Sequence, residues 1–207
     1  MRVDPREPRL TAAIATVVAT TPTSATLALT AVSGADEYAW LPAVLPPGLL
    51  RPGTNVLAVE MHQNGTTSSD LSFDLELLAT LRPSSPIALV PANATWRYLD
   101  TGVNPGTTWR LPSFNDAAWR SGPGRFGFGG DGETTRLSRT NASGGTNLTF
   151  LFRHAFYLPN PAAVPSLTAR LTRDDGAALY LNGWELLRDN LPDGPLGVST
   201  LATAAIG

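Results

Sequence analysis

Four stretches of the chain alternate between apolar and polar residues with a period of two. The clearest is DLSFDLELLA, residues 70–79, in which Leu71, Phe73, Leu75 and Leu77 occupy alternate positions. Because successive side chains of an extended strand point to opposite faces, this pattern predicts a strand with one buried face. The same alternation predicts strands in NVLAVEMHQ (55–63), NLTFLFRHAFYLP (147–159) and LTARLTRD (167–174).

Each of these stretches is short and is bounded by glycine, proline or asparagine. Glycine and proline, 19 and 18 of the 207 residues, also favour many short elements joined by turns over long helices. The stretch TAAIATVVAT, residues 11–20, fits either a helix or a strand, and its β-branched residues favour a strand. The chain is therefore predicted to be all-β, with antiparallel strands packed as the two sheets of a β-sandwich.

The sequence LYLNGWEL, residues 179–186, predicts a β-hairpin with a two-residue turn at Asn182 and Gly183, because this pair tolerates positive φ at both turn positions. Trp184 then shares a face with leucines. It is interpreted as a residue of the core or of the core rim in preference to an exposed platform for a sugar ring. The turn sets three predicted cross-strand pairs: Leu181 with Trp184, Tyr180 with Glu185, and Leu179 with Leu186.

Composition and charge exclude several classes of function. The formal charge of −2 provides no concentrated cationic surface, so neither a nucleic acid nor an anionic membrane is expected as a partner. The absence of cysteine excludes disulfides, thiolate catalysis and zinc–thiolate sites. No apolar run approaches the roughly 18 residues needed to span a bilayer, and the first residues lack the apolar segment of a signal peptide.

Four longer strings of the sequence carry a resemblance to a known family. They are WRYLDTGVNPGTTWRLPSFNDAAWRSGPGRFGFGGDGE, FLFRHAFYLP, LTRDDGAALYLNGWELLRDNLPDGPL and LPPGLLRPGTNVLAVEMHQNGTTSSDLSFDLEL. These strings resemble the galactose-binding-domain-like jelly rolls that are appended to large secreted bacterial proteins, including metallophosphoesterase-like and other hydrolases. The strings are also similar to the sugar-binding domain of family 2 glycoside hydrolases.

The resemblance implies an antiparallel jelly-roll fold, an extracellular or cell-surface location for the full-length protein, and carbohydrate binding beside a catalytic domain. It also implies that Trp96, Trp109 and Trp119 are framework residues, since tryptophan recurs at the equivalent positions of the family. His154 departs from the family, which tends to carry arginine there.

The order of the strings also departs from the family, and this defines the predicted domain organisation. Residues 34–79 match strands that come last in the family, whereas residues 94–207 match the strands that precede them. Residues 80–93, with three prolines, are predicted to be a linker, and residues 1–33 receive no assignment. Either the chain joins parts of two tandem modules, or residues 34–79 complete residues 94–207 as a circularly permuted sandwich.

A short repeat supports the tandem alternative. TLALTAVSG, which ends at Gly34, resembles TLATAAIG, which ends at Gly207, with one residue inserted. The two segments are separated by about the length of a domain, which is the spacing that a tandem array produces.

The adjacent carboxylates of Asp174 and Asp175 form the strongest polar cluster. Adjacent carboxylates repel each other unless a cation or backbone donors compensate, so the pair is a candidate calcium site. Flocculin-type lectins hold calcium and sugar with a similar pair. The alternative is that both side chains accept hydrogen bonds from backbone amides at the end of a strand.

Other candidate residues give weaker signals. GRFGFGGDGE, residues 124–133, lacks the strand, helix and lysine of a phosphate-binding loop and is predicted to be a surface loop at the rim of a binding concavity. His62 and His154 show no metal-ligand spacing and are interpreted as structural. Neither HExxH nor GxSxG occurs, so no catalytic group is predicted. The candidate ligand-binding residues are Trp184, Tyr180, Asp131 and Glu133.

These observations lead to two expectations of function. The first is a non-catalytic carbohydrate-binding module that acts beside other domains of the same polypeptide. The second is a structural spacer or protein-contact module attached to a hydrolase such as a metallophosphoesterase, because one fold serves many functions.

Overall fold

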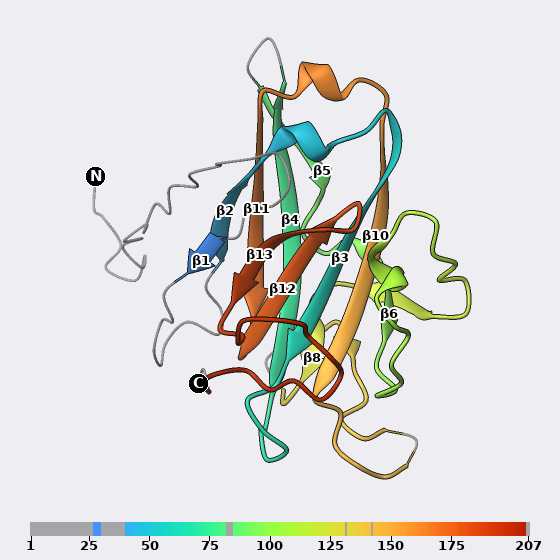
Figure 1. Ribbon diagram of the computed structural model, residues 1–207, viewed down its shortest axis with the longest axis vertical. Coiled ribbons are helices and arrows are strands. Elements are labelled where there is room, and N and C mark those ends of the chain that lie inside the picture. The colour runs from blue at the N-terminus through green and yellow to red at the C-terminus, as the bar shows by residue number, and fades with distance from the viewer. Residues whose placement is uncertain (1–26, 30–39, 82–84, 131, 142, 206–207) are drawn as a thin grey trace.

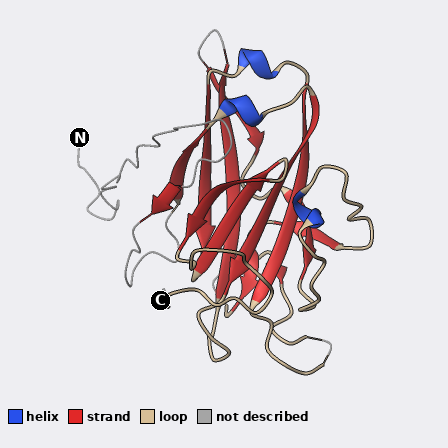
Figure 2. Cartoon of the chain, viewed as in Figure 1, coloured by secondary structure: helices blue, strands red, loops and turns tan. Residues whose placement is uncertain are grey.

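The computed structural model describes residues 27–29, 40–81, 85–130, 132–141 and 143–205. These residues form two β-sheets that face each other across one hydrophobic core, so the predicted β-sandwich is confirmed (Figures 1 and 2). Among them, no helix has the length and apolar character needed to cross a membrane. The described helices are single 3₁₀ turns: η1 (Pro47–Leu49), η2 (Thr108–Arg110) and η3 (Pro161–Ala163).

The first sheet has seven strands in the order β1-β13-β12-β3-β10-β6-β7. Its neighbouring strands are antiparallel, except that β1 pairs with β13 in parallel. Its strands are β1 (Leu27–Leu29), β13 (Trp184–Asp189), β12 (Gly176–Leu181), β3 (Gly53–His62), β10 (Thr149–Leu158), β6 (Thr95–Leu99) and β7 (Arg120–Pro123).

The second sheet has the order β2-β11-β4-β8-β9, and β5 pairs with β4 beside this path. Because β4 is long, β8 pairs with its first residues and β5 with its last ones. The strands are β2 (Leu41–Leu45), β11 (Ser166–Arg173), β4 (Leu71–Leu81), β8 (Phe126–Phe128), β9 (Thr135–Arg136) and β5 (Ser85–Val90).

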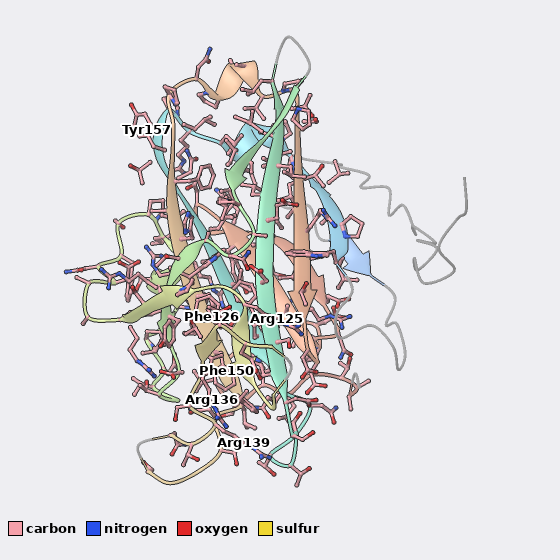
Figure 3. The ribbon with its side chains drawn as sticks, turned by 180° about the vertical axis from the view of Figure 1, so that it is seen from behind. Arg125, Phe126, Arg136, Arg139, Phe150 and Tyr157 are labelled. Atoms are coloured by element: carbon pink, nitrogen blue, oxygen red, sulfur yellow. The ribbon has the colours of Figure 1, made fainter. Side chains whose placement is uncertain are left out.

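The predicted alternation of β4 is confirmed, since Leu71, Phe73, Leu75 and Leu77 are all buried in the core between the sheets. The inward faces of β10 and β8 add aromatic rings to the same core, among them those of Phe150 and Phe126, which Figure 3 labels. Burying this apolar surface supplies the main favourable free energy for packing the two sheets.

Strand β3 is buried on both faces, which its alternation alone does not predict. Its inward side chains lie in the core, while its outward residue Ala58 belongs to a second, smaller apolar cluster. Residues of the loop between β6 and β7 cover this outer face of the first sheet, with Trp109 and Trp119 packed over it. The outer face of a sandwich sheet is more often solvated.

Residues 34–79 and residues 94–207 match different ends of the family's strand order. The described parts of both ranges contribute strands to both sheets. In the first sheet, β3 lies between β12 and β10. In the second sheet, β2 and β4 lie on either side of β11, and β8 also pairs with β4. Strands before residue 82 and strands after residue 94 are therefore interleaved. The ambiguous stretch 11–20 and most of the repeat copy that ends at Gly34 lie outside the described residues, whereas the copy that ends at Gly207 is described over residues 200–205.

The predicted linker, residues 80–93, contains the end of β4 and the whole of β5, so it is not a simple connector. Strand β5 pairs only with β4 among the described strands, and such an edge position tolerates Pro86, whose nitrogen carries no hydrogen and cannot donate to a neighbouring strand. Ile87 is 39% exposed and Val90 is fully buried. Prolines and weak alternation are typical of such an edge strand, and they conceal it in the sequence.

The glycine-rich stretch 124–133 is also more ordered than the predicted surface loop. Its residues 126–128 form β8, whose side chains are buried. A Cβ atom at Gly127 would lie 1.9 Å from the carbonyl oxygen of Leu71, so only glycine allows β8 to approach β4 this closely. The glycine here serves backbone packing.

The hairpin between β12 and β13 turns at Asn182 and Gly183, whose φ angles of 52° and 92° are those that the sequence predicts. The pairs of Leu181 with Trp184 and of Tyr180 with Glu185 are confirmed. The third predicted pair is wrong, because a bulge makes Leu179 face Leu187 in place of Leu186.

Candidate functional site

The tip of this hairpin is fixed by the side chain of Asn182, which is buried. Its Oδ1 atom accepts a hydrogen bond of 3.0 Å from the backbone N–H of Val56. Its Nδ2 atom donates to the carbonyl of Leu49 at 2.9 Å and to the Oδ1 atom of Asn55 at 2.8 Å. The turn residue therefore holds the hairpin against β3 and the segment before it, which makes the tip rigid.

Trp184 follows this turn directly, and 41% of its surface is exposed. Of the two predicted positions, the core and the core rim, the exposure of Trp184 excludes the core and fits the rim. Although it lies opposite the buried Leu181, it occupies the first position of β13, directly after the turn. Its indole is the largest apolar group at the end of this hairpin.

A second exposed apolar side chain, that of Leu111, lies against the same turn. A Cβ atom at Gly183 would be 2.7 Å from Cδ2 of Leu111, and Leu111 is also 41% exposed. We refer to the three residues at this turn, Leu111, Gly183 and Trp184, as the tip surface. Trp184 is the cross-strand partner of Leu181, whose side chain faces the main core, whereas Leu111 follows Arg110 on the outer side of the sheet. The residue before Leu111, Arg110, places its guanidinium 4.1 Å from the centre of the Tyr180 ring and 5.6 Å from that of Trp109.

The loop that carries Leu111 is held by Arg153 of β10, which is buried. Its Nε atom donates to Oδ2 of Asp116 at 2.7 Å, and its Nη1 atom donates to the carbonyl oxygens of Trp109 and Leu111. Nη2 donates to the carbonyl of Phe114. A charge-assisted arrangement of this kind fixes the backbone on both sides of Leu111, so the tip surface is held from β10 as well as from Asn182.

A buried carboxylate lies beneath Arg110. Glu60 of β3 accepts hydrogen bonds from the Tyr180 hydroxyl and, at 2.9 Å, from Nη2 of Arg110. Nε2 of His62 is 3.5 Å from its second carboxylate oxygen. Burial alone would raise the pKa of the Glu60 carboxyl, but His62, Arg110 and Tyr180 together outweigh burial and lower it. Glu60 is therefore an ionised group sealed inside the protein.

Tyr180 itself is 1% exposed, so the prediction that it binds a ligand is wrong. Burial and the adjacent Glu60 carboxylate raise the pKa of its phenol, which keeps the hydroxyl protonated as a donor to Glu60. The ring is covered on its outer side by Arg110 and meets Trp109 edge to face. Tyr180 supports the site from below.

The two histidines have the structural surroundings that were predicted for them. Nδ1 of His62 lies 2.6 Å from the carbonyl of Thr200 and 3.0 Å from the hydroxyl of Thr149. Nδ1 of His154 lies 2.9 Å from the carbonyl of Thr95. Burial lowers the pKa of His154. Both rings tie neighbouring backbone segments together.

Asp174 and Asp175, the candidate calcium ligands, are both buried at the end of β11. Oδ2 of Asp175 accepts hydrogen bonds from the backbone N–H of Asn64 at 2.5 Å and from the hydroxyl of Ser68 at 3.3 Å. Its φ angle of 55° places it in the left-handed region that aspartate tolerates. No group of three His, Cys, Asp or Glu side chains suited to a metal occurs in the part of the chain that the structure describes. These contacts favour the turn-stabilising interpretation.

The remaining candidates do not join the tip surface. Asp131 lies outside the described residues. Oε1 of Glu133 accepts a hydrogen bond from the backbone N–H of Gly130 at 3.0 Å, within the connection between β8 and β9. Glu133 thus belongs to the second sheet, whereas Trp184 belongs to the first.

The predicted framework role of the other tryptophans is confirmed, because Trp96, Trp109 and Trp119 are at most 9% exposed. Sequence reasoning missed Glu60, Arg110 and Arg153. In the sequence, Glu60 and Arg153 look like ordinary solvent-facing residues of alternating strands. Only the loop between β6 and β7, folded over the sheet, turns these positions into a buried layer.

No protein-family model, curated protein or solved structure matches this chain. The fold and the geometry of the site are therefore the basis for any functional conclusion. Among the described residues, the ionised groups beside the tip surface are engaged in holding loops, and the accessible chemistry there is an exposed indole and an exposed leucine on a rigid support.

Proposed function

We propose that the chain is a non-catalytic β-sandwich module that binds carbohydrate at the tip surface. The observation that carries this proposal is the exposed indole of Trp184 on a hairpin whose turn residue, Asn182, is locked by three hydrogen bonds. A flat aromatic ring offers an apolar face of the size of a pyranose ring, whose axial C–H groups form an apolar surface of their own.

Rigidity favours this role. Immobilising a mobile side chain or loop on binding costs about 0.5–1.5 kcal/mol for each side chain that is ordered. Asn182 holds the turn before Trp184, and Arg153 holds the backbone on both sides of Leu111, so the backbone of the tip surface is ordered before any ligand arrives. The guanidinium of Arg110, whose side chain is 18% exposed, precedes Leu111 in the chain and offers a charged donor on the outer side of the sheet.

The resemblance to galactose-binding-domain-like jelly rolls adds to the proposal. In this interpretation the sandwich is a jelly roll in permuted strand order, attached to a secreted bacterial protein. It would raise the local concentration of a neighbouring catalytic domain on its polysaccharide substrate. Neither a calcium ion nor a catalytic group of this chain is required for that role.

A second candidate function is a spacer or protein-contact module. The observation that favours it is that several charged side chains are buried and form ion pairs inside the sandwich. They are Glu60, Arg153, Arg173 and Asp189. Such a module resists deformation without needing a ligand.

Retention on immobilised polysaccharides, together with a glycan array, separates the two functions. The carbohydrate-binding module should be retained by at least one polysaccharide, and the Trp184→Ala variant should lose that retention. Tyr157→Ala is a matched control, since Tyr157 is 72% exposed and lies near the end of β10 that leads into η3 (Figure 3). An intact chain that binds no glycan on either format would support the spacer and contradict our proposal.

A further inference from the structure

The first five strands depend on the rest of the chain for their partners. Among the described residues, the strands before residue 91 form only one ladder with each other, that of β4 with β5. Their other ladders are all with strands that follow residue 94: β1 with β13, β2 with β11, β3 with β10 and β12, and β4 with β11 and β8.

The later strands are equally incomplete without the first five. In the first sheet, β3 separates the pair β12–β13 from the group β10-β6-β7. In the second sheet, β4 separates β11 from β8 and β9. Removal of the first five strands would open a gap one strand wide in each sheet, and unpaired backbone groups and apolar faces would line both gaps.

A single short turn joins these two interdependent units. Strand β5 of the second sheet ends at Val90, and β6 of the first sheet begins at Thr95. Between them, the backbone N–H of Ala94 donates to the carbonyl of Pro91 at 3.1 Å, which closes a tight turn. Asn93 in this turn has a φ angle of 64°, a conformation that asparagine tolerates and that glycine adopts at a lower cost.

We propose that the strands before residue 91 exchange between two copies of this chain, with residues 91–94 as the hinge. An exchanged dimer keeps every strand ladder and every core contact of the monomer, because each unit meets the same partner surface on the other copy. The turn changes, and with it the hydrogen bonds that the N–H of Asn93 donates to the carboxylate of Asp74. An extended hinge releases Asn93 from its left-handed conformation, whereas the closed monomer is favoured by the high effective concentration of two units on one chain.

The partner is therefore a second copy of the chain, or a neighbouring module of the same sequence in a longer polypeptide. In the exchanged dimer, β3 of one copy pairs with β10 and β12 of the other copy. Strand β4 of the first copy likewise pairs with β11 and β8 of the second. This inference does not depend on carbohydrate binding.

The absence of cysteine in this chain allows a direct test with engineered pairs. Val44 of β2 and Thr168 of β11 are cross-strand partners, and Val44 is 54% exposed. Full-length Val44→Cys and Thr168→Cys chains, one of them isotope-labelled, are mixed in denaturant, refolded together under reducing conditions at high concentration, and then oxidised. Exchange brings position 44 of one copy against position 168 of the other.

Random pairing of copies predicts that about half of the exchanged dimers carry one such disulfide, which mass spectrometry identifies from the labelled and unlabelled peptides. Val44→Cys mixed with Tyr157→Cys is the matched control for collisions, because both side chains are exposed and they are not strand partners. The chain that carries both Val44→Cys and Thr168→Cys shows that the two positions can be linked within a monomer. A linked yield no higher than that of the collision control would overturn the proposal.

The hinge provides a second test. Asn93→Gly removes the cost of the left-handed turn and should lower the yield of linked dimer several-fold, while deletion of residues 92 and 93 should raise it by making the turn too short to close. If the deletion variant does not fold, the comparison of Asn93→Gly with the unchanged hinge still decides the role of the turn. Equal yields from these two chains would contradict a hinge at residues 91–94.

Discussion

The hydroxyl of Tyr180 donates a hydrogen bond to the carboxylate of Glu60, and both side chains are buried on the outer face of the seven-stranded sheet. The bond joins β12 to β3 on the side away from the main core. Arg110 closes over both groups from the loop between β6 and β7. Through Arg110, this layer supports the loop that carries Leu111.

Removing the Tyr180 hydroxyl should weaken this support. We expect Tyr180→Phe to lower the free energy of unfolding by about 1.5–3 kcal/mol, because a buried ionised acceptor loses a donor that water cannot replace. Denaturant unfolding measures this loss. Tyr157→Phe is the control, and its exposed position predicts no measurable change. Equal stability of Tyr180→Phe and the unchanged chain would show that the bond contributes nothing.

Ionisation of Glu60 gives a second prediction, which concerns pH. The pKa of Glu60 in the folded protein is below its ordinary value of 4.5, so its contribution to stability is complete above that value and is lost as the pH falls through the lowered pKa. The stability difference between the unchanged chain and Glu60→Gln should therefore be largest near neutral pH and shrink below pH 4.5.

The comparison with Glu60→Gln is necessary because other carboxyls respond in the opposite direction. Burial raises the pKa of Asp74 and of Asp189, so protonation of these groups in acid favours the folded state. Both contributions are common to the two chains and cancel in the difference. A difference that stays constant from pH 7 to pH 3 would contradict an ionised Glu60.

Substitution of Asp175 tests whether this residue stabilises a turn or binds calcium. We expect Asp175→Ala to lower the free energy of unfolding by about 2 kcal/mol, because the N–H of Asn64 and the hydroxyl of Ser68 lose a buried charged acceptor. Thermal melts of the unchanged chain with chelator and with added calcium should coincide. A melting temperature that falls with chelator only when Asp175 is intact would instead establish a calcium site at this turn.

Gly127 tests the close approach of β8 to β4. Gly127→Ala would place a methyl group 1.9 Å from the carbonyl oxygen of Leu71, so the two strands must separate. We expect a loss of about 3 kcal/mol or more in the free energy of unfolding. Gly48→Ala is the matched control, since a Cβ atom there meets nothing within 4 Å and its φ angle suits alanine. Similar stabilities of the two variants would show that β8 can move without cost.

The sequence predicts the elements of this fold that carry a clear local signal. The alternation of β4 and the Asn182-Gly183 turn depend on neighbouring residues alone, and both are confirmed. Strand β5 was missed because its prolines and its edge position remove the alternation on which the prediction depends. The bulge that shifts Leu179 by one residue likewise has no signal in the turn.

The candidate site was harder to predict because it depends on which faces are covered. Tyr180 and Trp184 are both aromatic residues of one hairpin, yet a loop that begins more than 60 residues earlier in the chain covers the first and not the second. Burial of Glu60 follows from the same loop. Period-two patterns indicate which residues share a face, but they contain no information on what packs against that face.

The most direct test of the account is the affinity of the intact chain for the glycan that retains it, measured by titration calorimetry beside Trp184→Ala and Tyr157→Ala. We predict that Trp184→Ala weakens binding at least about tenfold, which corresponds to about 1.4 kcal/mol, while its melting temperature and the affinity of Tyr157→Ala stay unchanged. Undiminished affinity in a folded Trp184→Ala chain would contradict a carbohydrate site at the tip surface.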